Sequence, residues 1–255
     1  MKNKQGDQMK IRTINKGLLA GIAALALSGV SAQAEIIYTE VFNNTSGGNE
    51  ALSAGYGGFT GYRDDGTDFT GSTGDPLTVN QNGFIFIGSG AANQGDSYAL
   101  LSGAGSVDPT AYQNDLTIAF NSNSTDANPA NAEMGWRVLA TVGSTIYASD
   151  LIGITSVEAV KSVVVSDAAW HVWTSETDLT DGFNIANIDG GAGINLAAGS
   201  ISDIGVLAID GAAGNDRMRF RDFTISGTVV PEPATIGLVA AFGGGILFIR
   251  RRFMI

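Results

Sequence analysis

Short apolar runs separated by turn-forming residues are the feature that most limits what this chain can fold into. About ten runs follow one another between residues 35 and 230, and none keeps the period of an amphipathic helix. They are 36–42, 83–87, 98–101, 116–120, 135–142, 145–148, 162–165, 169–174, 201–209 and 217–226. Gly, Asn, Asp and Ser clusters separate them, as in turns. This spacing predicts an all-β fold, an antiparallel β-sandwich of the jelly-roll type.

Two of the runs also predict how their side chains are arranged. In 135–142, apolar residues occur on both faces of the expected strand, which indicates an inner strand of a sheet. In 217–226, the apolar residues before Arg221 and those after Asp222 fall on opposite faces. A β-bulge near Arg221 and Asp222 would bring them to one side, so we predict one there.

The charge of the central segment excludes one class of partner. Residues 35–230 contain 6 Lys or Arg and 23 Asp or Glu side chains, a formal charge of −17, against −11 for the 255-residue chain. Such a surface repels phosphate backbones, so we expect no nucleic acid partner. It suits solubility in a salty exterior, and cation binding is the alternative. With no cysteine in the chain, disulfides and thiolate sites are excluded.

Residues 1–34 predict a secretory signal peptide. Basic residues are scattered over 1–16, residues 17–30 carry no charge, and Ala32-Gln33-Ala34 matches the A-x-A site of a signal peptidase. We therefore expect an N-terminal signal helix that is removed by cleavage between Ala34 and Glu35. A permanent anchor helix is the alternative, and the short apolar run disfavours it.

Three elements follow one another at the C-terminal end. Pro231-Glu232-Pro233 fixes an extended segment, residues 234–249 form an apolar run, and Arg250-Arg251-Arg252 follows. As a helix the run would be about 24 Å long, slightly short of a hydrocarbon core of about 30 Å. The arginines favour the cytoplasmic side. We expect a single transmembrane helix over 234–249 with a basic tail, which tethers the precursor to the membrane transiently.

In this order, VPEPAT, the short apolar span and RRR resemble the PEP-CTERM sorting signal. The resemblance implies that an exosortase, a membrane protease or transpeptidase, cuts near Pro231-Glu232-Pro233 and releases the protein to the cell surface or extracellular matrix. A generic tail anchor is the alternative. The resemblance covers residues 231–255 and implies nothing about the activity of the central segment.

Residues 35–230 are expected to form one β-sandwich domain between these two ends. Its first run, IIYTEVFNN at 36–44, and its last, RMRFRDFTISG at 217–227, resemble the terminal strands of concanavalin A-like or carbohydrate-binding jelly-roll domains. This resemblance implies the architecture and only weakly a carbohydrate ligand.

One motif raises the alternative of an enzyme. The E-x-D-x-x-D spacing of residues 176–181 resembles the E-x-D-x-x-E motif of a retaining glycoside hydrolase family on this fold. Asp181 replaces the expected acid/base Glu and shortens its reach, and residues 180–182 have the composition of a turn. We therefore expect no catalytic activity, with a secreted glycoside hydrolase as the alternative.

His171 is the only histidine, between Trp170 and Trp173 in an expected strand. It lacks a second histidine, so we expect a packed or surface residue and not a general base or metal ligand. Alternation predicts that Trp170 and Val172 face opposite to His171 and Trp173. An outer-face Trp can stack on a sugar ring, but core packing is the commoner role. The same two alternatives apply to Trp136, Tyr56 and Tyr62.

Two acidic turns, 63–68 and 210–216, have the oxygen-rich composition that Ca²⁺ prefers. Solvated turns are commoner, so structural calcium remains an open alternative and no metal, cofactor or catalytic residue is assigned. Residues 190–193 are Gly-rich but lack the Lys and helix of a phosphate-binding loop.

The sequence thus predicts an exported, membrane-tethered precursor that ends at the cell surface or in the extracellular matrix. Its expected partners are a signal peptidase, an exosortase, the membrane and an extracellular polysaccharide. Its core is expected to serve adhesion, glycan binding or matrix structure.

Overall fold

The computed structural model describes thirteen stretches of the chain. They are residues 34–42, 50–51, 59–63, 78–80, 82–87, 97–102, 104–112, 115–124, 134–174, 183–196, 200–209, 218–230 and 233–253. Residues 34–229 form one compact unit that contains all of the described strands. The predicted signal peptide lies outside the described residues, except for Ala34 of its cleavage site.

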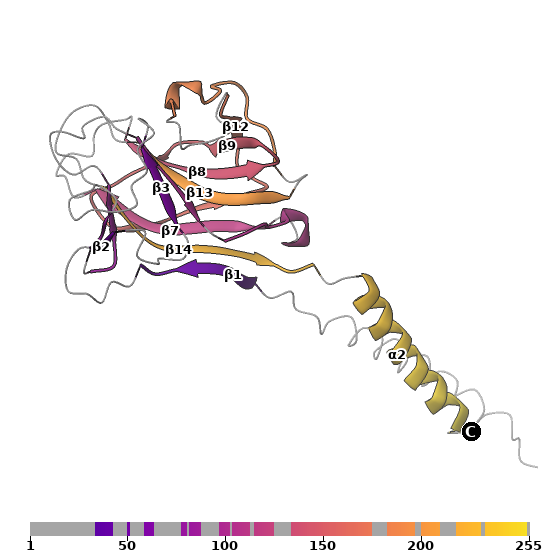
Figure 1. The fold of residues 1–255 in the computed structure, drawn as a ribbon. Coiled ribbons are helices and arrows are strands. Elements are labelled where there is room, and N and C mark those ends of the chain that lie inside the picture. Colours follow the sequence, from indigo (N-terminus) through magenta and orange to yellow (C-terminus); the bar gives the residue numbers. More distant parts are fainter. Residues whose placement is uncertain are drawn as a thin grey trace, which may run out of the picture. The chain divides into compact units, whose positions relative to one another are not determined.

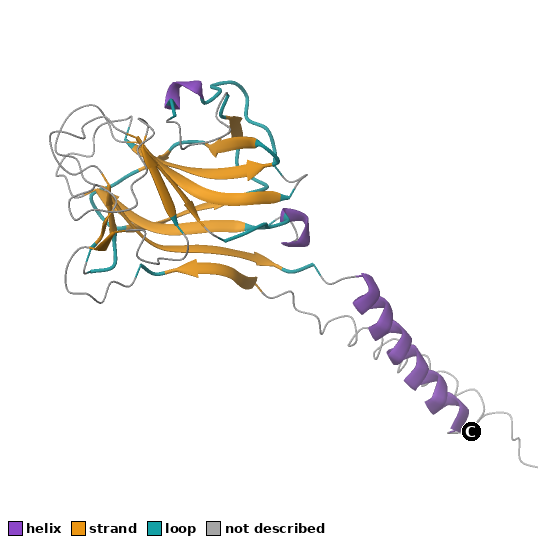
Figure 2. Ribbon diagram, in the orientation of Figure 1, coloured by secondary structure: helices purple, strands orange, loops and turns teal. Residues whose placement is uncertain are grey.

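The compact unit consists of two seven-stranded antiparallel sheets, which appear as stacked layers in Figures 1 and 2. The order in sheet A is β11 (Ala159–Val164), β7 (Thr117–Ser124), β14 (Met218–Thr228), β5 (Ile85–Ile87), β4 (Thr78–Val79) and β2 (Glu50–Ala51), with β1 (Ala34–Glu40) also paired to β14. The order in sheet B is β12 (Trp170–Val172), β9 (Thr145–Ser149), β8 (Gly135–Val142), β13 (Ile201–Ile209), β6 (Ser97–Ser102) and β3 (Thr60–Arg63), with β10 (Ile152–Gly153) also paired to β8. Two short 3-10 helices, η2 (Pro109–Tyr112) and η3 (Ile185–Asn187), lie in the connections.

The predicted antiparallel β-sandwich is therefore confirmed. Each of the predicted runs contains a strand, and successive strands from β5 to β8 alternate between the two sheets, as in a jelly roll. Four strands were not predicted: β2, β3, β4 and β10. Each has only two to four residues, too few to show a period.

Aromatic side chains from both sheets form the centre of the core. Phe120 of β7 and Phe220 of β14 approach Trp136 of β8, with ring centroids 5.5 and 5.3 Å away. Phe42 and Phe59, which precede β2 and β3 in the chain, join this cluster through ring contacts with Phe220. Aromatic pairs in such tilted and edge-to-face arrangements stabilise a core beyond the area they bury.

The predicted β-bulge is confirmed. The register of β14 against β7 shifts between Arg221 and Thr224, and Asp222 has a positive φ of 54°. The extra residue restores the alternation, so the apolar residues on both sides of the bulge share the inner face. The buried residues are Met218, Phe220, Phe223 and Ile225.

The prediction that residues 135–142 form an inner strand is also confirmed, because β8 lies between β13 and β9 and is buried on both faces. Its outer face belongs to a second apolar cluster. Residues 183–196, here called the strap, contribute Phe183 to this cluster, where it packs on Trp173 at 5.1 Å between ring centroids. The outer face of sheet B is thus largely covered.

Outside the compact unit, helix α2 (Pro233–Phe253) forms at the predicted place and has Arg250-Arg251-Arg252 in its last turn. Proline is well suited to the first position of a helix, because it has no amide proton to leave unpaired. Within the described residues no helix is both long and apolar enough to cross a membrane. The predicted transmembrane span over 234–249 is therefore not confirmed; four glycines and three arginines lower the apolar content of this helix. Pro231 and Glu232 lie outside the described residues.

Candidate functional site

Several candidates from the sequence lie outside the described residues. The acidic motif at 176–181 is one, and Tyr56 is another. The two acidic turns for which calcium was an alternative, 63–68 and 210–216, also fall there except for Arg63. Among the residues that are described, no group of three His, Asp or Glu side chains could hold a metal ion.

The tryptophans pack in the interior and do not offer a surface for a sugar ring. Trp136 and Trp170 are fully buried between the sheets, and Trp173 is only 1% exposed beneath the strap. The indole of Trp173 donates to the carbonyl oxygen of Asn184 at 2.9 Å. The predicted alternation is confirmed, because Trp170 and Trp173 belong to different clusters on opposite faces. Sugar stacking on Trp173 is wrong, because the ring is only 1% exposed. Tyr62 is partly buried against the same cluster.

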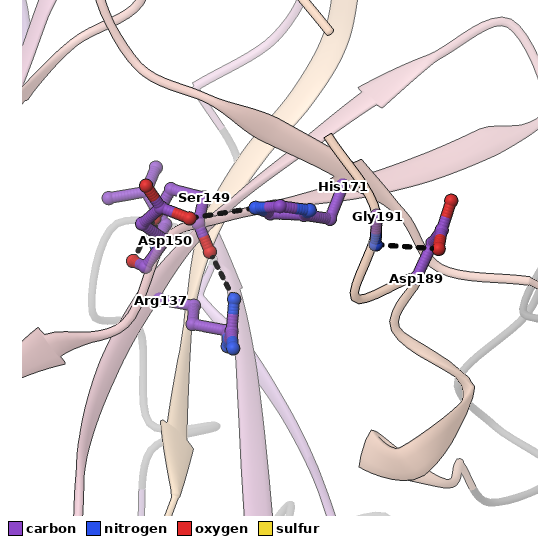
Figure 3. A network of polar contacts seen from close by, with 7 residues as sticks. Arg137, Ser149, Asp150, His171, Asp189 and Gly191 are labelled. Atoms are coloured by element: carbon purple, nitrogen blue, oxygen red, sulfur yellow. Dashed lines mark hydrogen bonds and ion pairs between the residues drawn. The ribbon is translucent and has the colours of Figure 1, made fainter. Parts of the chain in front are cut away.

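His171 belongs to a polar cluster on the outer face of sheet B (Figure 3). Its Nε2 lies 2.7 Å from Oδ1 of Asp150, and the imidazole is largely buried while the carboxylate is exposed. Arg137 donates from Nη1 to the carbonyl oxygen of Ser149 at 2.6 Å. Burial lowers the pKa of the Arg137 guanidinium, and Asp150 opposes this effect.

This cluster lacks the parts of a nucleophilic site. The hydroxyl oxygen of Ser149 accepts a hydrogen bond from the amide of Val138 at 2.9 Å and donates to the carbonyl oxygen of Asp150 at 3.0 Å. It is therefore held in the backbone network and is not hydrogen-bonded to His171. Asp189, also drawn in Figure 3, accepts a hydrogen bond from the amide of Gly191 within the strap. The cluster joins β8, β9 and β12, and we interpret it as structural.

A different arrangement occurs on the outer face of sheet A. In β14 the inward residues alternate with Arg219 and Arg221, which therefore face away from the core. The register places Arg219 opposite Phe86 of β5 on one side and Asn123 of β7 on the other. We call this surface the arginine face, and it consists of Phe84, Phe86, Asn121, Asn123, Arg219 and Arg221.

Arg219 is held by two aromatic rings. Its guanidinium carbon lies 5.0 Å from the ring centroid of Phe84 and 5.3 Å from that of Phe86, within cation–π range. The two rings meet edge to face. Among the described residues Arg219 has no ion pair, and its Nε is buried without a hydrogen-bond partner.

Arg221, two residues further on, is neutralised instead. Its guanidinium donates from Nε and Nη2 to Oε1 of Glu158, the first of these at 3.0 Å, and its Nε also lies 3.5 Å from the Asp222 carboxylate. Asn121 donates to Asp222 at 2.7 Å. The bulge is responsible, because it turns Asp222 to the same side as these partners.

Asn123 is nearly buried, with 9% of its surface exposed. Its Nδ2 makes long contacts of 3.4 and 3.5 Å to the carbonyl oxygens of Ser124 and Ser156. Its Oδ1 is buried without a hydrogen-bond partner. Buried polar groups are nearly always paired, so an unpaired acceptor opposite an unpaired donor is unusual.

Sequence reasoning did not identify the arginine face. One signal was present: Arg217, Arg219 and Arg221 are three of only six basic residues in the acidic segment 35–230. Their alternation with buried residues indicates a basic row on one side of a strand. The partners of that row come from distant strands and could not be predicted from it.

No protein-family model matches the chain, and no curated protein matches it. Solved structures with a similar arrangement include the basic winged bean lectin with Tn-antigen, at 8% identity and a TM-score of 0.40, covering 78% of this chain and all of that one. A family 11 carbohydrate-binding module from Clostridium thermocellum, in complex with a β-1,3-1,4-mixed-linked tetrasaccharide, has 11% identity and a TM-score of 0.38 over 73% of this chain and 100% of that chain. The CBM2 module of the Lactobacillus casei BL23 phage J-1 evolved Dit has 12% identity and a TM-score of 0.37 over 80% and 100%. Likeness at this level does not establish a shared ligand.

Proposed function

We propose that this chain is an exported cell-surface or extracellular-matrix protein whose β-sandwich is a non-catalytic glycan-binding module for adhesion or matrix structure. The export signals are features of the sequence, and the binding activity is inferred from the arginine face. The two parts of the proposal rest on different observations and are tested separately.

The arginine face is the observation that carries the binding activity. Sugar recognition requires planar hydrogen-bonding groups at defined positions beside an apolar wall. Arg219 provides donors that Phe84 and Phe86 orient, and Asn123 provides an acceptor from the neighbouring strand. Because these groups lie on strands of one sheet, their spacing is set by the backbone, which favours a binding site.

The carboxylates next to this face support a non-catalytic role. Glu158 is bound to Arg221, and Asp222 accepts a hydrogen bond from Asn121. A retaining hydrolase needs two carboxyl groups about 5 to 5.5 Å apart that are free to act as nucleophile and acid. Both of these carboxylates are occupied by hydrogen bonds within the protein.

For export, we propose that an exosortase processes the chain at its sorting signal and that a signal peptidase cuts between Ala34 and Glu35. Strand β14 ends at Thr228, before Pro231, so a cut near Pro231-Glu232-Pro233 leaves sheet A complete. The N-terminal strand β1 pairs with the end of β14, with Ala34 opposite Thr228. Loss of both ends would therefore remove only Ala34 from the described strands.

A binding assay tests the activity. The exported full chain is applied to an array of soluble and immobilised polysaccharides, and released reducing ends are measured in parallel. We expect retention on at least one polysaccharide without release of reducing ends. The absence of any glycan binding would overturn the glycan-binding proposal, and the release of reducing ends would favour the hydrolase alternative.

A processing assay tests the export signals. Replacement of Pro231, Glu232 and Pro233 by alanine should leave a longer precursor that stays with the membrane fraction of a host with an exosortase. Processing of the variant at the same rate as the natural chain would contradict the sorting proposal.

A further inference from the structure

We infer that the arginine face selects neutral saccharides by binding a pair of vicinal hydroxyl groups between Nε of Arg219 and Oδ1 of Asn123. This inference rests on the proposed glycan-binding function and adds the chemical class of the ligand.

The two atoms belong to neighbouring positions of the sheet. Arg219 of β14 and Asn123 of β7 are directly opposite each other in the register. Side chains at opposed positions of an antiparallel pair project from the same face, with Cβ atoms about 4.5 to 5.5 Å apart. One atom is a donor and the other an acceptor, and both are buried without a partner.

The orientation of the Asn123 amide is set by its surroundings. Its Nδ2 faces the carbonyl oxygens of Ser124 and Ser156. A flipped amide would place Oδ1 against two other acceptors, which is unfavourable. The group that Asn123 offers to a ligand is therefore an acceptor, and only a donor can satisfy it.

Arg219 differs from Arg221 in its pairing, because no described acidic side chain forms an ion pair with it. Both arginines lie over the ring of Phe84, but of the two only Arg221 is paired with described acids, Glu158 and Asp222. Both unpaired atoms are shielded from solvent, so access of a ligand requires the long Arg219 side chain to change its rotamer.

These two requirements distinguish between ligand classes. A carboxylate, sulfate or phosphate can accept from Arg219 but cannot donate to Asn123, and it would lie near Glu158 and Asp222 in a domain of charge −17. An ammonium group can donate only. Two adjacent hydroxyl groups can accept from Arg219 and donate to Asn123 at once, so a neutral sugar with a vicinal diol satisfies both atoms.

The test uses the full chain and a panel of soluble neutral polysaccharides, each before and after periodate oxidation, with dextran sulfate as the anionic probe. Periodate cleaves the bond between vicinal hydroxyl carbons and leaves isolated hydroxyl groups intact. We expect binding to a neutral polysaccharide, a loss of about tenfold or more in affinity after oxidation, and weaker binding of dextran sulfate.

Two variants locate the effect. Arg219→Lys keeps the charge but removes Nε, and Asn123→Leu removes the acceptor at similar volume; each should weaken binding about tenfold or more. Arg137→Lys is the matched control, because Arg137 also has a buried, unpaired Nε but lies on sheet B. It should leave the affinity unchanged. Circular dichroism confirms that each variant is folded.

The outcomes separate the inference from the proposed function. If no polysaccharide binds, the glycan-binding function and this inference are both overturned. If a polysaccharide binds but oxidation or Arg219→Lys has no effect, or if dextran sulfate binds more tightly, glycan binding stands and the diol inference is overturned. The oxidation arm uses the natural chain, so it decides the question even if a variant does not fold.

Discussion

The two sheets share one core through their inner faces, but their outer faces differ in what lies on them. On sheet B an apolar cluster that includes Leu139, Trp173 and Leu207 packs with Phe183 of the strap, beside the polar cluster of His171. The outer face of sheet A presents the donors of Arg219 and, on the neighbouring strand, the acceptor of Asn123. A sandwich needs only its inner faces to fold, so we interpret the outer face of sheet B as a surface used for stability and propose recognition for that of sheet A.

The edges of the sheets repeat the contrast. At the edge of sheet B, the strap pairs with β12 through reciprocal hydrogen bonds between Trp170 and Ile194 of 3.0 and 2.8 Å. At the edge of sheet A, β11 pairs only with β7 among the described strands and exposes Val160. It carries Lys161, the only lysine of residues 35–230, and a charge of this kind discourages pairing with another chain.

The largest expected effect concerns the covered face. Trp173→Ala should lower the free energy of unfolding by about 3 to 5 kcal/mol, as for a core aromatic, because the strap buries the ring completely. Phe86→Ala, the corresponding truncation on the outer face of sheet A, should cost clearly less because Phe86 is only half-buried. Urea denaturation monitored by circular dichroism measures both. Equal costs for the two variants would remove the contrast between the faces.

A smaller effect is expected where the strap approaches β12. A Cβ at Gly193 would lie 2.5 Å from Cβ of Ala169, so Gly193→Ala should displace the strap and cost about 1 to 3 kcal/mol. Gly190→Ala is the matched control in the same segment, because a Cβ there meets nothing within 4 Å. Thermal unfolding should give a lower melting temperature for Gly193→Ala than for Gly190→Ala. Identical melting temperatures would show that the close contact between Gly193 and Ala169 does not affect stability.

We predict that the stability of the domain depends on pH through Asp203, which lies on β13 of sheet B. Burial raises its pKa to about 6, although the amide of Ile204 donates to it and opposes the shift. A carboxyl whose pKa is higher in the folded than in the unfolded state binds more protons when folded, so stability falls as the pH rises from about 4 to 6.

Asp203→Asn should therefore stabilise the protein at pH 7 by about 1 kcal/mol, a value that allows for partial exposure, and should have little effect at pH 4. Denaturation midpoints at the two pH values measure this difference. A gain that is the same at both values would be inconsistent with the raised pKa.

The smallest expected effect belongs to the arginine face. Glu158→Gln removes the charge that pairs with Arg221, but both side chains are about one-third exposed. Ion pairs of this kind contribute less than about 1 kcal/mol, so the unfolding free energy should change little. A loss as large as that of Trp173→Ala would mean that this face also serves stability.

Much of the fold could be predicted because the period of two is a local property. The bulge at Arg221 and Asp222 could be inferred from one broken alternation, since only an inserted residue returns Phe223 to the core. The opposite orientations of Trp170 and Trp173 likewise followed from alternation. The covering of Trp173 by the strap could not be predicted, because residues 183–196 show no hydrophobic period of a helix or strand.

The candidate site could not be predicted for a related reason. Phe86, Asn123 and Arg219 lie far apart in the sequence and meet only through the register of three strands. That register depends on tertiary pairing, which a single sequence does not specify. The unpaired atoms become visible only when all neighbours are in place.

The central claim is that the outer face of sheet A binds glycan and that of sheet B does not. The most direct test is a titration of the isotope-labelled full chain with a bound polysaccharide, followed by amide chemical shifts. We predict that the largest changes occur at residues 84–87, 119–124 and 218–222, with little change over 183–196 and around His171. Changes concentrated in the strap or near His171, with residues 218–222 unaffected, would contradict it.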